Sequence, residues 1–145
     1  MHITQKCQYG LRAVYELAKR AGQGPVKIAD IAEAQAIPPR FLEAILCQLK
    51  LAGFLVSKRG SEGGYTLARE PGEISVGELM RCIQGPMAPV SCVMGGSSEE
   101  CRLYGDCPFL AMWQRAHEAM SGVYDATTLS DLLRENRGNA ACYSI

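Results

Sequence analysis

Three cysteines lie close together in the stretch SCVMGGSSEECRLYGDCP at residues 91–108. Eight residues separate Cys92 from Cys101, and five separate Cys101 from Cys107. Three thiolates could ligate an iron–sulfur cluster that takes a fourth ligand from elsewhere. They could also bind zinc, although zinc ligands usually come in pairs about two to four residues apart. A thiol–disulfide switch beside Arg102 is the third chemistry, and inert thiols are the fourth reading of this pattern.

The total of seven cysteines is high and odd for 145 residues. The N-terminus has no apolar run of the signal-peptide type, and no apolar stretch is long enough to span a membrane. We therefore expect a cytoplasmic protein with no membrane contact, in which thiols serve metal or redox chemistry rather than structural disulfides. Cys47 and Cys82 lie in apolar helical patterns, and we expect both to be packing residues.

Charge is divided unevenly along a chain whose net charge is zero. Residues 1–69 carry ten Lys and Arg against five Asp and Glu, a net of +5, whereas residues 70–145 carry five against ten, a net of −5. This asymmetry suggests that the N-terminal half faces a polyanion.

The elements of that basic half have the order of a winged helix-turn-helix. Helical periodicity predicts helices over 4–21, 27–36 and 39–53, the last beginning at a proline. Residues 54–70 then read as a two-stranded hairpin with a basic, glycine-rich turn. In the third helix we expect an inward face made of Phe41, Leu42, Ile45, Leu46 and Leu49.

In this arrangement the third helix enters the major groove of DNA and the hairpin, or wing, approaches the backbone or minor groove. Arg can contact guanine or phosphate, and Glu can accept a hydrogen bond from cytosine. The residues predicted to contact DNA are Pro39, Arg40, Phe41 and Glu43 in the helix, and Lys58, Arg59, Gly60 and Ser61 in the wing.

The rest of the chain is predicted to contain three further helices, with the cysteine loop between the first and the second. Ser75 and Glu78 form a capping box that starts a helix over 74–85. A second helix is expected over 108–124, and a short third one follows Thr127 or Thr128. The fold class is thus mainly α, divided into a winged helix-turn-helix domain (1–84), a cysteine-bearing loop (85–107), a long dimerisation helix with a short C-terminal helix (108–136), and a tail (137–145).

Several segments resemble the bacterial iron–sulfur-cluster regulators, whose members include IscR, NsrR and RirA and the cluster-free relative CymR. The resemblance rests on YGLRAVYELA, IADIAEAQAIPPRFLEAIL, SKRGSEGGYTLAR, ISVGELMRCIQGPMAPVSC and TLSDLL, and it covers residues 1–135. It implies a homodimeric winged-helix transcription factor whose helix 108–124 crosses to the partner. It further implies that Cys92, Cys101 and Cys107 hold a 2Fe–2S or 4Fe–4S cluster.

The fourth ligand departs from the pattern of this family. Leu110 stands where IscR-like members have a ligating His, and Gln8 stands where some NsrR-like members supply an Asp from the partner subunit. Cys7 or Gln8 of a partner subunit is the candidate fourth ligand, and His2 and His117 are weaker candidates. We expect His117 to be an exposed partner of a nearby carboxylate.

The resemblance implies a regulator, such as a repressor, that binds a palindromic operator in double-stranded DNA under the control of a cluster sensing iron, redox state or nitric oxide. The alternative is a cluster-free regulator controlled by thiol oxidation or by a partner protein. We do not expect an enzyme, because no nucleophile–base set, phosphate-binding loop or carboxylate pair stands out.

Overall fold

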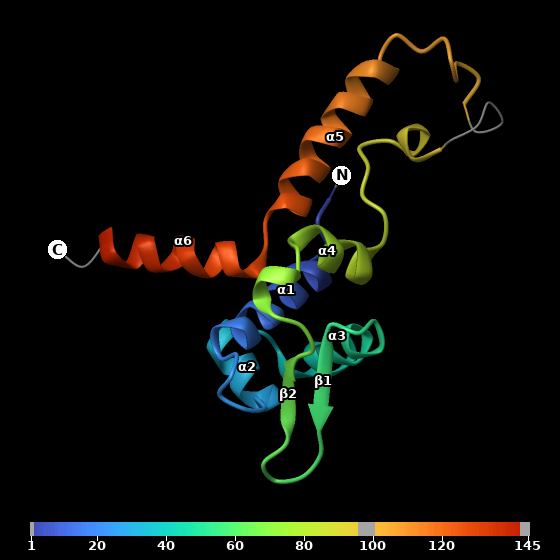
Figure 1. The fold of residues 1–145 in the computed structure, drawn as a ribbon. Helices are drawn as coiled ribbons and strands as arrows, with labels where there is room; N and C mark the ends of the chain where they lie inside the picture. Colours follow the sequence, from blue (N-terminus) through green and yellow to red (C-terminus); the bar gives the residue numbers. More distant parts are fainter. Residues whose placement is uncertain (1, 96–100, 143–145) are drawn as a thin grey trace.

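The computed structural model describes residues 2–95 and 101–142. Its N-terminal body is built on helix α1 (Gln5–Lys19), which runs through the centre in Figure 1, with α2 (Ile28–Gln35) and α3 (Pro39–Leu51) packed against it. The Thr4 side chain caps α1 by accepting a hydrogen bond from the Cys7 amide at 3.1 Å, and Pro39 opens α3, as expected. Apolar residues at helical spacing face inward from all three helices.

The wing consists of β1 (Leu55–Lys58) and β2 (Gly64–Leu67), paired antiparallel with Leu55 opposite Leu67. Val26, between α1 and α2, exchanges two backbone hydrogen bonds of 2.9 Å with Tyr65 and so ties strand β2 of the wing to the segment between these helices. Gly64 has a φ of +154° and lies against the Val26 backbone, where a β-carbon would overlap it. Glycine at the start of β2 therefore allows the wing to pack closely against the body.

Helix α4 (Val76–Gln84) follows a short 3-10 turn, η1 (Pro71–Glu73), and completes the core. The capping box predicted from the sequence is confirmed: the Glu78 amide donates to Ser75 Oγ at 3.2 Å, and the Ser75 amide donates to Glu78 Oε2 at 3.0 Å. Leu79, Met80 and Ile83 are buried on the side of α4 that packs against α1.

Beyond α4 the chain leaves the core. Apart from a 3-10 turn, η2 (Ser91–Met94), the described part of the cysteine segment is irregular, and it leads into α5 (Leu110–Ala126). Figure 1 shows α5 projecting away from the body. None of its residues is buried, so this helix has no core of its own in the single chain.

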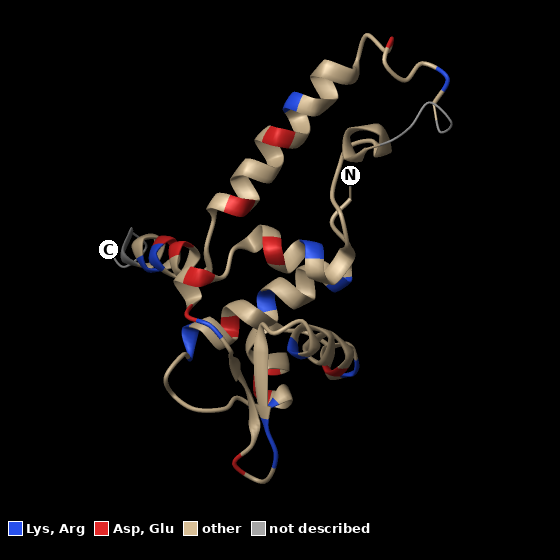
Figure 2. Ribbon diagram, turned by 45° about the vertical axis from the view of Figure 1, so that its right-hand side comes forward, with Lys and Arg blue, Asp and Glu red and all other residues tan. Residues whose placement is uncertain are grey.

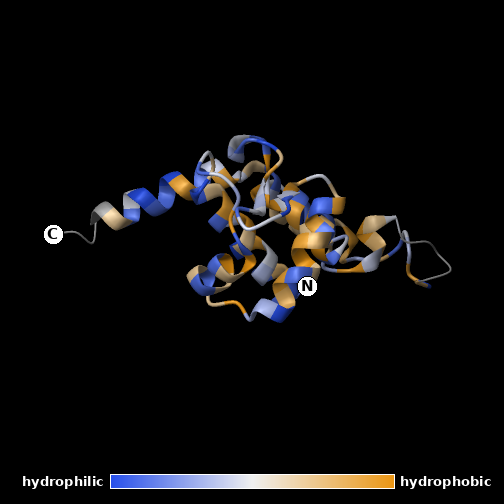
Figure 3. Cartoon of the chain, turned by 90° about the horizontal axis from the view of Figure 1, so that it is seen from below, coloured by the Kyte–Doolittle hydropathy of each residue, from blue (hydrophilic) through white to orange (hydrophobic). Residues whose placement is uncertain are grey.

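Helix α6 (Leu129–Cys142) returns to the body, where Leu129 is buried and the helix contacts α1 and η1. It is longer than the short helix that the sequence predicted and continues through much of the expected tail, of which residues 143–145 lie outside the described residues. Figure 3 shows mostly hydrophilic colours along α6. A polar helix of this kind lacks the apolar stripe by which sequence patterns are recognised.

Two expectations about the core were wrong. Phe41 was expected on the inward face of α3 but is 43% exposed, and Cys47 was expected to pack but is exposed. Cys82 is half-buried on α4. No helix in the described ranges is both long and apolar enough to cross a membrane.

Candidate nucleic-acid interface and cysteine loop

The turn between α2 and α3 is held by an arginine from α1. Ala36 ends α2 in the left-handed conformation, with a φ of +50°, and the Ile37 amide donates to the Ala32 carbonyl at 2.9 Å. The Arg12 guanidinium donates to the carbonyls of Gln35 and Ala36, the latter at 3.2 Å. Arg12 therefore satisfies carbonyls that the end of α2 leaves unpaired, a role that sequence reasoning missed.

A buried carboxylate joins the ends of α1 and α2. Glu16 is 2% exposed and accepts hydrogen bonds from Gln35 Nε2 at 2.7 Å, Arg20 Nε at 2.8 Å and Lys19 Nζ at 3.3 Å. Burial raises the pKa of Glu16, but these three donors outweigh it and hold the pKa below its ordinary value. Basic residues three and four positions after Glu16 were the only sequence signal for this site.

The start of α3 presents every residue that was predicted to contact DNA there. Pro39, Arg40, Phe41 and Glu43 are all exposed. The Arg40 guanidinium lies 4.8 Å from the centre of the Phe41 ring, and that ring lies 6.0 Å from the ring of Tyr9 on α1. Phe41 is thus outside the core because it packs between a cation and a second aromatic ring.

A groove of about 270 Å³ runs between the starts of α1 and α3 and is lined by Lys6, Tyr9, Arg40, Phe41 and Ala44, among others. Lys6 Nζ donates to Gln48 Oε1 at 2.7 Å, and this partner is a neutral amide rather than a carboxylate. The two cations at the rim of the groove suit a polyanion such as the DNA backbone.

The wing tip carries the other predicted contacts. Lys58, Arg59, Gly60 and Ser61 are exposed, and Figure 2 shows basic and acidic segments together at the tip. Within residues 2–95 and 101–142, neither Lys58 nor Arg59 has an ionic or hydrogen-bonded side-chain partner. The two cations are therefore available to an external anion.

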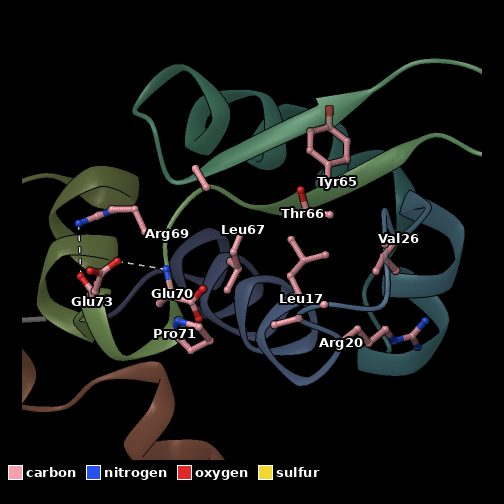
Figure 4. Close-up of a pocket in the computed structure, with 14 residues that line it drawn as sticks. Leu17, Arg20, Val26, Tyr65, Thr66, Leu67, Arg69, Glu70, Pro71 and Glu73 are labelled. Atoms are coloured by element: carbon pink, nitrogen blue, oxygen red, sulfur yellow. Dashed lines mark hydrogen bonds between the residues drawn. The ribbon is translucent and has the colours of Figure 1, made fainter.

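A second cavity, of about 310 Å³, lies at the base of the wing between α1, β2 and η1, and Figure 4 shows it. Its charged groups already have partners. Arg69 donates to the Glu73 carbonyl at 3.3 Å and stacks 4.9 Å from the Phe54 ring, and the Glu70 amide donates to Glu73 Oε2 at 3.3 Å. These contacts fix the wing to the body.

The three loop cysteines are free thiols that the single chain does not gather. Cys92 in η2 and Cys107 are half-buried, and Cys101 is exposed. In the described parts of the chain no three His, Cys, Asp or Glu side chains converge into a group that could hold a metal ion.

The candidate fourth ligands lie in different environments. Cys7 is fully buried in the core, and burial raises the pKa of its thiol. Gln8 is exposed, and its side-chain amide donates to the Ile3 carbonyl at 3.3 Å. His2 is also exposed. The burial of Cys7 disfavours it as a ligand for another subunit.

His117 differs from its expected role. It is half-buried rather than exposed, and its Nδ1 has no hydrogen-bond partner among the described residues, so the expected pairing with a carboxylate was wrong. It lines a pocket of about 430 Å³ with Met94 of η2 and with Arg81 and Asp125. These last two form an ion pair of 2.7 Å that joins α4 to α5.

Comparison with known proteins identifies the fold and the family. A family model described as "Rrf2: Iron-dependent Transcriptional regulator" matches residues 3–135. The regulator CymR of Bacillus subtilis is 34% identical over 143 residues, covering 99% of this chain and 97% of CymR. IscR of Aliivibrio salmonicida is 32% identical over 136 residues, covering 94% of this chain and 79% of IscR.

Solved structures agree. That of B. subtilis CymR has a TM-score of 0.75 at 34% identity and covers 91% of this chain and 95% of its own. The structure of T. potens IscR has a TM-score of 0.73 at 32% identity, and the match covers 94% of this chain and 88% of the IscR chain. The winged-helix architecture matches the expectation from sequence, and these relatives are named transcriptional regulators, as expected, rather than enzymes. The chain belongs to the Rrf2 family of DNA-binding transcriptional regulators.

Proposed function

We propose that the chain is a cytoplasmic, homodimeric regulator whose affinity for a palindromic operator is controlled by an iron–sulfur cluster held at Cys92, Cys101 and Cys107. The observation that carries this is three free thiols in one segment that connects the DNA-binding body to α5. Thiolates are the ligands that such clusters require. The iron-dependent description of the family and the IscR relatives support the same reading.

The donor types fit a cluster, although their positions in the single chain do not yet form a site. The cluster, when bound, would supply an iron centre sensitive to redox state, iron supply or nitric oxide. Holding it requires the segment from Cys92 to Cys107 to bring its thiols together. The exposed Gln8 of a partner subunit, or solvent, is the better candidate for the remaining position, because Cys7 is buried.

The end of α4 offers a route from this segment to the recognition helix. Gln48 of α3 donates to the Cys82 carbonyl at 2.8 Å and accepts from Lys6 of α1 at 2.7 Å. Gln84 accepts from the Thr4 amide at 3.1 Å. A change in the loop that shifts this last turn of α4 therefore acts on α1 and α3 together. A coupling free energy of about 1–3 kcal/mol would change operator affinity about 5–150-fold.

The exposed apolar side of α5 supports the dimer. Phe109, Met112 and Val123 are 57%, 42% and 63% exposed. A projecting helix with such a side gains its hydrophobic contacts from another chain, and a second copy places two recognition helices on the two halves of a palindrome.

The test is anaerobic purification followed by iron and sulfide analysis, absorbance spectroscopy and native mass spectrometry. We expect iron and sulfide in the protein, and we expect Cys101→Ala to lose the visible absorbance and keep the fold. Cys47→Ala is the matched control, since this thiol is exposed but lies outside the loop, and it should keep the absorbance. Protein without iron, sulfide or visible absorbance would contradict the proposal.

A cluster-free regulator is the second candidate, favoured by the similarity to CymR. A structure of the oxidized form of Staphylococcus aureus CymR is 32% identical, with a TM-score of 0.69, and covers 91% of this chain and 95% of its own. In this case the metal-free protein should lose operator binding when peroxide oxidises the thiol of Cys101. Cys101→Ser should then retain operator binding under peroxide, and equal sensitivity of both proteins would exclude this route.

A further inference from the structure

The outermost line of α3 is formed by Arg40, Ala44 and Cys47. The three residues are exposed, and spacings of four and three residues place them on one side of a helix. Leu42, Ile45, Leu46 and Leu49 occupy the opposite side and are buried. The line therefore lies on the outer side of α3, where Arg40 and Ala44 also border the groove beside α1. This is the helix that a winged helix-turn-helix protein inserts into DNA.

The chemistry of this line changes along its length. Arg40 at its start is cationic and can read the O6 and N7 atoms of guanine. Ala44 and Cys47 are small and apolar, and free Cys behaves as a small hydrophobe. Among the described residues the Cys47 thiol has no hydrogen-bond partner, and Cys47 is not in a disulfide. Small side chains at the centre of the line let the helix backbone approach base edges closely.

In the major groove the apolar group that distinguishes one base pair from another is the C5-methyl of thymine. We propose that Ala44 and Cys47 are specificity-determining residues that read thymine methyl groups beside a guanine contacted by Arg40. The proposal rests on the proposed function only in requiring that α3 enters an operator. Each buried methyl should tighten operator binding about fourfold.

The first experiment removes single methyl groups from the DNA. An operator is selected from a pool of randomised duplexes, and each thymine is then replaced by uracil, which lacks only the C5-methyl. We expect a loss of about fourfold in affinity at two positions in each half-site. In the Ala44→Ser protein, replacing thymine by uracil should no longer lower the affinity at one of these positions. In the Cys47→Ser protein the same should hold at the other position. Each protein–DNA pair thus forms a double-mutant cycle.

Ala52→Ser is the matched control, because Ala52 is exposed at the end of α3 but lies off this line. In Ala52→Ser, replacing thymine by uracil should still lower the affinity at both positions. Both test positions are exposed and helical, so the variants should fold, and circular dichroism with thermal unfolding checks this.

The second experiment uses the reactivity of Cys47 itself. N-ethylmaleimide should alkylate Cys47 rapidly in the free protein, and bound operator should slow the reaction at least tenfold, as read by peptide mass spectrometry. Operator binding with no uracil effect and no protection of Cys47 would overturn the inference and leave the proposed function standing. If no duplex is enriched from the pool, operator recognition itself fails and the inference falls with it.

Discussion

Glu16 shows how much the helix-turn-helix depends on a single buried charge. Its carboxylate holds Arg20 and Lys19 of its own helix and Gln35 at the end of α2, so it fixes the position of α2 relative to α1. Removing one partner of a buried charged group leaves the others unsatisfied, which usually destabilises a protein by about 1–3 kcal/mol.

The lowered pKa of Glu16 gives this contribution a pH dependence. A carboxyl group whose pKa is lower in the folded state stabilises the fold above its unfolded pKa, and the stabilisation is lost as pH falls through the folded pKa. We therefore expect Glu16→Gln to lower the free energy of unfolding at pH 7 by about 1–3 kcal/mol. Urea titration would show this as unfolding at a lower urea concentration. The difference from the original protein should shrink steadily below about pH 4.

The exposed Glu33 of α2 provides the control for this measurement. Glu33→Gln should change the free energy of unfolding by less than about 0.5 kcal/mol at either pH. A Glu16→Gln protein that matches the original across the pH range would show that the hydrogen bonds of Glu16 contribute nothing net.

Arg59 is the residue on which the proposed wing contact can be measured. It is exposed, and no other residue of the described ranges pairs with its guanidinium, so Arg59→Ala should weaken binding and lower the slope of log K against log salt by about one per subunit. Binding measured by fluorescence anisotropy over a range of salt concentrations gives the slope. Arg137→Ala, an exposed change in α6, should leave it as it was, and an unaltered slope in Arg59→Ala would exclude the contact.

At the scale of elements, the turn between α2 and α3 contains a residue in an unfavourable conformation. Ala36 has a φ of +50°, a region in which an L-residue with a β-carbon is about 1–2 kcal/mol less stable. Ala36→Gly removes this penalty but adds flexibility to the unfolded chain. We expect a net stabilisation of about 0.5–1 kcal/mol in thermal or urea unfolding.

Ala34→Gly is the control for the glycine substitution, because Ala34 is exposed inside α2. There glycine should destabilise by about 1 kcal/mol, following ordinary helix propensity. Opposite signs two residues apart would confirm that the conformation of Ala36 decides the effect, and destabilisation at both positions would refute it.

The sequence predicted elements well where the pattern is local. The capping box at Ser75 and the proline at the start of α3 were sufficient to place two helices, because both signals act within one turn. The exposure of Phe41 and the functions of Arg12, Glu16 and Gln48 could not be predicted, because each depends on a residue from a distant element. The length of α6 was missed for another reason, since its polar sequence carries no apolar periodicity.

The exposure of the candidate site residues was predictable to a similar degree, and their contacts with DNA and with a cluster stay predictions. The residues expected at the DNA are exposed on α3 and the wing. For Arg40 and Glu43 this follows from the regular spacing of inner and outer positions on a helix, whereas Phe41 had also been expected to face inward. The three cysteines were found by spacing, but spacing says nothing of how the segment between them folds. In the proposed function the convergence of the thiols depends on a cluster and on a second subunit, and neither is specified by local pattern.

At the scale of the whole molecule, α5 is the element that the single chain leaves incomplete. We expect the double variant Met112→Glu, Val123→Glu to be monomeric in light scattering while circular dichroism shows the same helix content, because neither residue is buried within one chain. Four carboxylates facing each other across a dimer contact would oppose association.

Gln114→Glu, a substitution at an exposed position on the polar side of α5, is the matched control and should leave the protein dimeric. Since the operator is proposed to be a palindrome, the monomeric variant should also lose most of its operator affinity. A double variant that still scatters light as a dimer would place the contact on another element.

The hydrogen bond from Gln48 to the Cys82 carbonyl links α3 to the last turn of α4, after which the chain enters the segment with Cys92, Cys101 and Cys107. Thermodynamic linkage acts in both directions. If the state of the cysteine segment changes operator affinity by some factor, then bound operator must change the equilibrium of that segment by the same factor. Operators of different strength would thus give the same regulator different thresholds for one signal. Where the signal lowers operator affinity, a gene with a strong site would respond later than a gene with a weak one, and where it raises affinity the order would be reversed.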